Sequence, residues 1–114
     1  MKIKDIIDVL DGHLIVGEEL LEKEVLSACA SDMMSDVLAF VKEQSVLITG
    51  LCNPQVIRTA EMMEMCCIVF VREKQPDEMM IEVARRKGIA LIGTKHRMFA
   101  SCGMLYAAGL KPEV

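Results

Sequence analysis

The fold is decided by residues 45–54, SVLITGLCNP. Residues 45–48 form a short apolar run that predicts a buried strand, and the small polar pair Thr49-Gly50 ends it. Asn53 is a favoured N-cap residue, and Pro54 suits the first position of a helix. This stretch therefore predicts a buried strand that turns directly into a helix, the repeating unit of α/β folds.

The same unit recurs along the chain. Apolar runs at residues 25–30, 67–71 and 89–93 predict three further strands, and a short strand is expected at 13–16. Helical spacing predicts helices over residues 3–10, 34–41, 54–63, 77–87 and 99–110. This alternation favours an α/β fold with a small, mostly parallel sheet, right-handed crossovers and helices on both faces. The place of strand 13–16 in the sheet stays open.

Two features of the helices matter for function. The second helix is expected to turn its apolar positions toward the core and to close at Lys42-Glu43-Gln44; these positions are Met34, Val37, Leu38 and Val41. Methionines gather on helical segments at residues 33–34, 62–65 and 79–80. They serve either as filler of the core or as an adaptable binding surface.

Length and charge exclude several classes of protein. A chain of 114 residues fits one domain, so residues 1–114 are expected to form a single unit. The formal net charge of -4 gives no cationic field for a nucleic acid. No apolar run approaches the roughly 20 residues that span a bilayer. Residues 1–5 alternate charged and apolar side chains instead of forming a signal peptide, so we expect a cytoplasmic protein.

The five cysteines show no Cys-x-x-Cys spacing. Their odd number and spacing argue against a disulfide framework or a zinc site, and we predict no metal and no cofactor. Small buried thiols are the simpler interpretation. Cys52 carries one alternative, because a strand-to-helix turn favours a thiolate, although no His follows closely to act as its base.

Polar residues follow the strands where a parallel sheet binds ligands. The carboxyl ends of parallel strands meet at one edge, and ligands bind outside it. The candidate ligand-binding residues there are Ser31, Asp32, Thr49, Gly50, Asn53, Arg72, Thr94 and Lys95. Helix capping, ordinary turns and solvated charge explain the same residues without a ligand. The sequence therefore predicts a place for a ligand without naming a reaction.

Three segments carry a resemblance to a known family. SDMMSDVL at 31–38, VLITG at 46–50 and GIALIGT at 88–94 resemble a DRTGG domain, and the resemblance covers nearly the whole chain. DRTGG domains are similar to the amino-terminal domain of HPr kinase/phosphorylase. They occur as non-catalytic regions in some phosphotransacetylases and in pyrophosphatases with CBS domains. The resemblance implies the fold of that amino-terminal domain. It also implies a regulatory or dimerising module without catalysis.

The residues that give the family its name are replaced in this chain. The Asp-Arg pair would fall near Cys52-Asn53, and the Thr-Gly-Gly would fall near residues 71–73, Val-Arg-Glu. An arginine and two glycines are thus lost from strand-end turns. This loss changes the charge of the turns and how closely a ligand can approach their backbone. The resemblance alone therefore does not assign the ligand of another family member to this chain.

Three functions follow as hypotheses. The first is a non-catalytic, ligand-sensing homodimer that binds a small anionic or nucleotide ligand at the strand ends. The second is a docking module without a ligand, which uses methionine-rich helix faces to bind a kinase, a phosphatase or a hydrogenase-associated enzyme. The third is an enzyme with Cys52 as its nucleophile. We expect the first, and hence no catalytic residues and no enzymatic activity.

Overall fold

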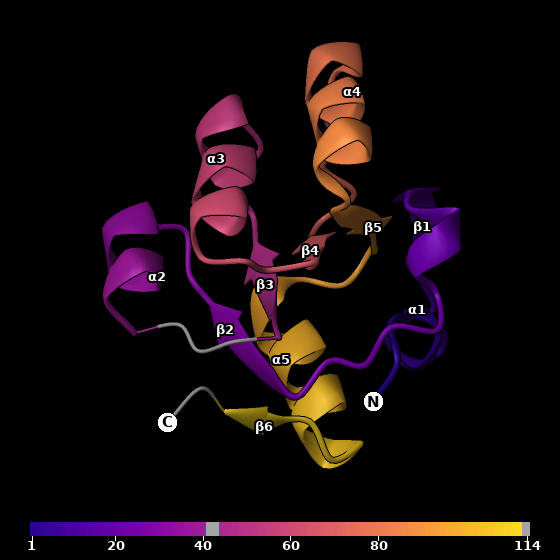
Figure 1. The fold of residues 1–114 in the computed structure, drawn as a ribbon. Coiled ribbons are helices and arrows are strands. Elements are labelled where there is room, and N and C mark those ends of the chain that lie inside the picture. Colours follow the sequence, from indigo (N-terminus) through magenta and orange to yellow (C-terminus); the bar gives the residue numbers. More distant parts are fainter. Residues whose placement is uncertain (41–43, 113–114) are drawn as a thin grey trace.

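The computed structural model describes residues 1–40 and 44–112 (Figure 1). Its centre is a six-stranded sheet in the order β1-β5-β4-β3-β2-β6. The strands are β1 (His13–Val16), β2 (Ser27–Ala30), β3 (Ser45–Thr49), β4 (Cys67–Phe70), β5 (Ala90–Gly93) and β6 (Lys111–Pro112). Strands β2 to β6 pair in parallel, and β1 pairs antiparallel with β5. The expected α/β fold with a mostly parallel sheet is confirmed.

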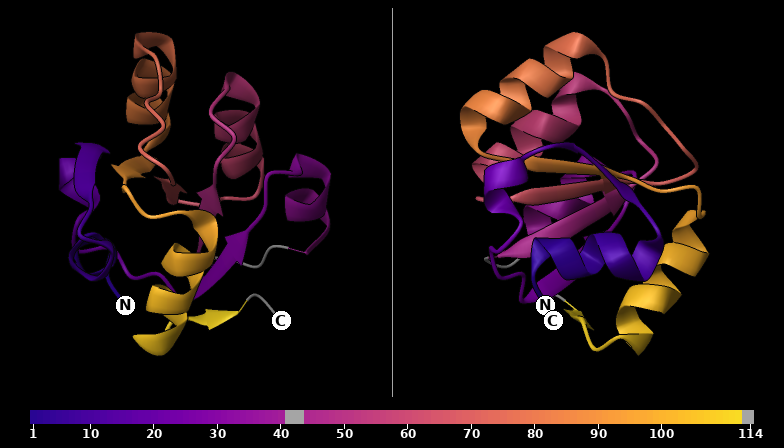
Figure 2. Two further views of the ribbon diagram at one scale, coloured as in Figure 1. Left: turned by 180° about the vertical axis from the view of Figure 1, so that it is seen from behind. Right: turned by 90° about the vertical axis from the view of Figure 1, so that its right-hand side faces the viewer.

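Helices cover both faces of the sheet (Figures 1 and 2). On one face lie α2 (Met34–Phe40), α3 (Pro54–Met62) and α4 (Glu78–Lys87). On the other face lie α1 (Ile3–Leu10) and α5 (Met98–Ala107). A short 3-10 helix, η1 (Glu18–Leu20), follows β1. No helix of the described residues is long and apolar enough to cross a membrane.

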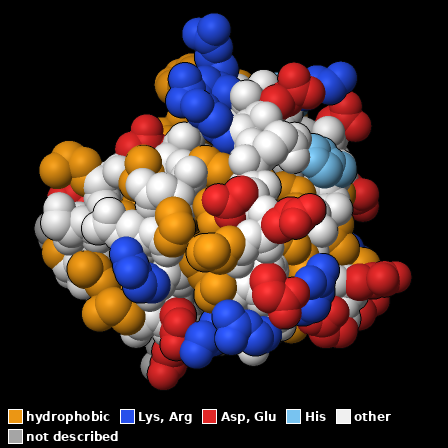
Figure 3. All heavy atoms as spheres, turned by 90° about the horizontal axis from the view of Figure 1, so that it is seen from above, with side chains coloured by type: hydrophobic (Ala, Val, Ile, Leu, Met, Phe, Trp, Pro, Cys, Tyr) orange, Lys and Arg blue, Asp and Glu red, His pale blue; other side chains and the backbone are white. Residues whose placement is uncertain are grey.

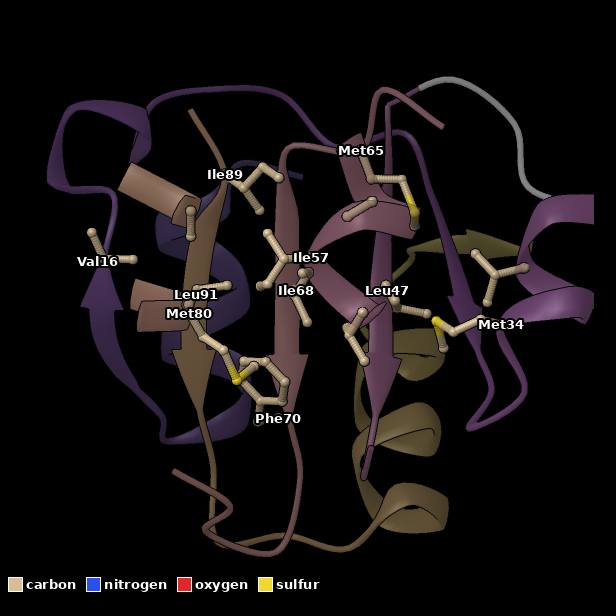
Figure 4. Packing of buried hydrophobic residues seen from close by; sticks show 14 of the residues in the cluster. Val16, Met34, Leu47, Ile57, Met65, Ile68, Phe70, Met80, Ile89 and Leu91 are labelled. Carbon is tan, nitrogen blue, oxygen red and sulfur yellow. The ribbon is translucent and has the colours of Figure 1, made fainter. Parts of the chain in front are cut away.

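The central strands are buried on both sides, which explains their unbroken apolar sequences. Leu47, Ile68 and Leu91 pack against the layer of α3 and α4 (Figure 4). Their neighbours Val46 and Val69 pack with α1 and α5 on the opposite side. Each residue of β3, β4 and β5 is buried, so these strands form a rigid platform for the loops at their ends.

The structure differs from the sequence predictions at the margins of the sheet. Leu38 is 42% exposed, because α2 lies at the side of the sheet and, among its residues 34–39, turns Met34 and Val37 into the core. Val41 and the predicted closing residues Lys42 and Glu43 lie outside the described residues, whereas the third closing residue, Gln44, is described and has a positive φ of 56°. The last helix ends at Ala107 instead of residue 110, because the chain leaves it to form β6 beside β2.

Candidate functional site

The residues that follow β2, β3, β4 and β5 form one continuous edge, which we call the strand-end rim. Backbone hydrogen bonds carry the pairing of the strands into these residues. Ser31 N–H donates to Ile48 O over 3.1 Å. Val71 N–H donates to Thr49 O, and Thr94 N–H donates to Phe70 O, each over 3.1 Å. The structure therefore brings together backbone segments from four strands at the edge where ligands of such folds bind.

Asp32 holds the start of the loop that follows β3. Its Oδ1 accepts the Thr49 hydroxyl at 3.0 Å and the Gly50 N–H at 2.7 Å. The Thr49 Oγ1 in turn accepts the N–H of Leu51 at 3.0 Å. Asp32 thus ties two neighbouring strand-end loops together. Its carboxylate also occupies the N–H of Gly50, which would otherwise face an incoming anion.

The side chains of three further candidate residues form hydrogen bonds with the backbone of the chain itself. Asn53 is the N-cap of α3, where its Oδ1 accepts the N–H of Gln55 at 2.9 Å. Ser31 Oγ accepts the N–H of Met33 at 2.9 Å and shapes the turn into α2. Thr94 is buried, and its hydroxyl donates to Leu10 O at 2.9 Å. These three residues position the rim.

Arg72 occupies an unusual backbone conformation. Both Arg72 (φ 58°) and Glu73 (φ 56°) lie in the left-handed region, which suits glycine and costs other residues roughly 1–2 kcal/mol each. The Arg72 N–H donates to His96 O at 2.9 Å, and the Glu73 N–H donates to Thr94 O at 2.8 Å. These two bonds hold the turn against the loop that follows β5.

The turn places the Arg72 guanidinium beside Gly50. A Cβ atom added at Gly50 would lie 3.0 Å from Arg72 Nη2 and 3.6 Å from both carboxylate oxygens of Asp32. Gly50 therefore leaves the space in which these two side chains approach. Arg72 and Lys95 are both exposed, and neither side chain has a hydrogen-bond or ion-pair partner among residues 1–40 and 44–112. The rim thus presents two unpaired cations on neighbouring loops.

Cys52, the candidate nucleophile, is not activated by its surroundings. Burial raises the pKa of the Cys52 thiol, and the nearby Lys74 offsets this rise only in part. A catalytic thiol needs the opposite shift, toward the thiolate at neutral pH. Within the described part of the chain, no group of three His, Cys, Asp or Glu side chains is placed to hold a metal ion.

Hydrophobic surface lies on both layers of helices. On the layer of α2 to α4, Figure 3 shows hydrophobic side chains between charged ones, and Met33, Met62 and Met79 are 60%, 71% and 71% exposed. On the other layer, Phe99 and Tyr106 of α5 are exposed, which the sequence analysis missed. The absence of any charged residue between positions 98 and 107 was the available signal.

Comparison with known proteins places the chain in a family. Residues 5–108 match the DRTGG domain family. A comparison with curated proteins gave no match. The fold is similar to a crystal structure of the CBS and DRTGG domains of the regulatory region of Clostridium perfringens pyrophosphatase, complexed with the activator diadenosine tetraphosphate.

The likeness to that regulatory region concerns the fold. The TM-score is 0.72 and the sequence identity 17%, and the match covers 91% of this chain and 45% of that chain. This chain therefore spans less than half the length of the structure that it resembles. The match to the family extends over nearly all of the sheet and its helices. This chain belongs to the DRTGG domain family.

Proposed function

We propose that this chain is a non-catalytic regulatory module that senses a small anionic ligand at the strand-end rim and acts as a homodimer. One observation carries the proposal. Arg72 adopts a conformation that costs free energy, and this conformation brings an unpaired guanidinium to the rim beside Gly50. Strained backbone of this kind is concentrated at functional sites.

The chemistry of the rim favours a phosphate group as the anion. A guanidinium binds two phosphate oxygens through parallel hydrogen bonds, and Lys95 on the adjoining loop adds a second positive charge. Gly50 keeps the approach open. Because Asp32 already occupies the Gly50 N–H, the phosphate binds on the outer side of Arg72.

The same site favours a nucleotide over inorganic phosphate. Asp32 Oδ1 accepts two hydrogen bonds, while Oδ2 has no donor among the described residues. A sugar hydroxyl next to the phosphate can donate to Oδ2. The activator named for the similar pyrophosphatase region, diadenosine tetraphosphate, contains both groups, which makes nucleotides the first class to test.

Calorimetric titration tests the proposal with diadenosine tetraphosphate, ATP, ADP and inorganic phosphate as probes. We expect saturable binding of at least one nucleotide, weaker binding of phosphate, and loss of binding in Arg72→Gln. Arg86→Gln is the matched control, because Arg86 is an exposed arginine at the carboxyl end of α4, away from the rim. Absence of heat from all four probes at millimolar concentration overturns the proposal, as does equal loss of binding in both variants.

A docking function is the second candidate, and the exposed methionines favour it. Met79 lines a groove of about 170 Å³ between α3 and α4, together with Ile57 and Val83. Such a surface suits a helix of a kinase, a phosphatase or a hydrogenase-associated enzyme. A pull-down from native extract with wild-type protein and Met79→Glu separates the two candidates. A partner that is lost only in Met79→Glu, without nucleotide binding by the purified protein, supports docking instead of sensing.

A further inference from the structure

We propose that two copies of this chain associate through the exposed face of α5, packed antiparallel about a two-fold axis at Gly103. The inference rests on the homodimer of the proposed function and identifies its surface. In Figure 2, α5 lies on the outside of the molecule, on the opposite side of the sheet from α3 and α4. Ser101 and Leu105 of α5 are buried, and Met98, Cys102 and Met104 are partly buried against the core. The exposed face consists of Phe99, Ala100, Gly103, Tyr106 and Ala107.

The composition of this face is unusual for a helix in contact with water. The sequence of α5, MFASCGMLYA, contains no charged residue. Phe99 is 92% exposed and Tyr106 is 68% exposed. Their spacing of seven residues sets both rings on the same side of the helix. The surface continues into an apolar groove of about 160 Å³ beside β2 and β6, lined by Tyr106, Leu110 and Pro112.

Gly103 lies between the two rings, and the isolated chain gives no reason for a glycine there. A Cβ atom added at Gly103 would meet nothing within 4 Å, and the residue does not have a positive φ. Glycine in the middle of a helix is destabilising relative to alanine. A second helix that approaches closely at this point accounts for the missing side chain.

The face is complementary to itself under two-fold symmetry. In an antiparallel pair, residues at similar distances from the axis meet, so Phe99 of one copy faces Tyr106 of the other, and Ala100 faces Ala107. The aromatic rings then form two pairs beside a central contact between the glycines. Each Arg97 also comes to lie near the carboxyl end of the other α5, where the helix dipole favours a cation. A parallel pair would instead bring the basic residues 95–97 of both copies together.

The area available fits a stable dimer. A covered aromatic side chain buries roughly 150–250 Å². The four rings of two copies therefore contribute on the order of 600 Å², about half of the roughly 1,200 Å² that the smaller stable interfaces bury. Ala100, Gly103, Ala107 and the adjoining groove are placed to contribute the remainder. A second copy of this chain is thus a sufficient partner for the whole face.

Two charge variants test both the surface and its orientation by light scattering over a concentration series. We expect wild type to be dimeric, and Phe99→Glu and Tyr106→Lys each to weaken the dimer about tenfold or more, which corresponds to about 1.4 kcal/mol. An equimolar mixture of the two variants should recover the dimer, because the new carboxylate faces the new ammonium group and the other aromatic pair stays intact. Met79→Glu, on the opposite layer, is the control and should remain dimeric.

Circular dichroism verifies that each variant is folded. Because both rings are highly exposed, we expect neither substitution to unfold the chain. A wild-type protein that stays monomeric at every concentration overturns the inference together with the homodimer, while nucleotide binding is tested separately. A dimer that neither variant weakens overturns the α5 surface alone. Variants that are monomeric and fail to recombine in the mixture overturn the antiparallel arrangement that we propose.

Discussion

Replacement of Arg72 by glycine should stabilise the fold and at the same time weaken ligand binding. At φ 58°, the Cβ of Arg72 lies too close to the backbone, which lowers the free energy of unfolding by roughly 1–2 kcal/mol. Glycine removes this cost but makes the unfolded chain more flexible, which lowers the free energy of unfolding again by about 0.5–1 kcal/mol. The net gain is about 0.5–1 kcal/mol, or roughly 2–6 °C in Tm for a domain of this size. No side-chain bond of Arg72 is lost among the described residues.

Binding should change in the opposite direction. A hydrogen bond to a charged group is worth about 1.5–3 kcal/mol, so loss of the guanidinium should weaken nucleotide binding by roughly 10- to 150-fold. Glu73→Gly is the matched control, because φ at Glu73 is 56° and the substitution relieves the same strain without removing the cation. It should raise Tm by a similar amount and keep the affinity.

Thermal unfolding and calorimetric titration of both glycine variants measure these two effects. A lower Tm in Arg72→Gly would refute the strain argument. Equal loss of affinity in Arg72→Gly and Glu73→Gly would show that the shape of the turn, and not the guanidinium, binds the ligand.

Three further predictions concern stability. Asp32→Ala removes the acceptor of the Gly50 N–H and should lower the free energy of unfolding by about 1–2 kcal/mol in urea titrations; an unchanged midpoint would contradict the bond. Thr94→Val leaves the Leu10 carbonyl without its donor and should cost about 1–3 kcal/mol, whereas Thr94→Ser should retain most of the stability. Burial raises the pKa of the Cys67 thiol well above its ordinary value. The unfolded thiol ionises near pH 8.5, so its contribution to stability should be complete below that pH and lost as the pH rises further. Urea unfolding at increasing pH should show this fall, and Cys67→Ala should reduce it.

The rim could be predicted from sequence because its signals are local. The apolar runs of β3, β4 and β5 and the capping pair Asn53-Pro54 specify strands, turns and a helix start within a few residues. Parallel pairing then places the strand ends together. The roles of the rim residues depended on tertiary contacts. Asp32 was predicted to bind a ligand or to cap α2, and no sequence signal indicated the bonds that its Oδ1 accepts from Thr49 and Gly50 on the next strand-end loop.

Other features had no clear local signal. The left-handed turn at residues 72–73 contains neither glycine nor asparagine, so tertiary bonds to residues 94–96 hold a conformation that the sequence disfavours. Strand β6 has only two residues and forms because the chain passes beside β2. Leu38 has the correct helical spacing for burial but is 42% exposed, because α2 lies at the side of the sheet. Local pattern thus specified the elements, and packing at the margins decided the rest.

An NMR titration of ¹⁵N-labelled protein with diadenosine tetraphosphate shows whether the strand-end rim binds a nucleotide. We expect saturable shifts of the amide signals of Gly50, Arg72 and Lys95, with little change in α5 and in the groove between α3 and α4. Saturable shifts confined to either of those helical surfaces, or none at millimolar nucleotide, would contradict nucleotide binding at the rim.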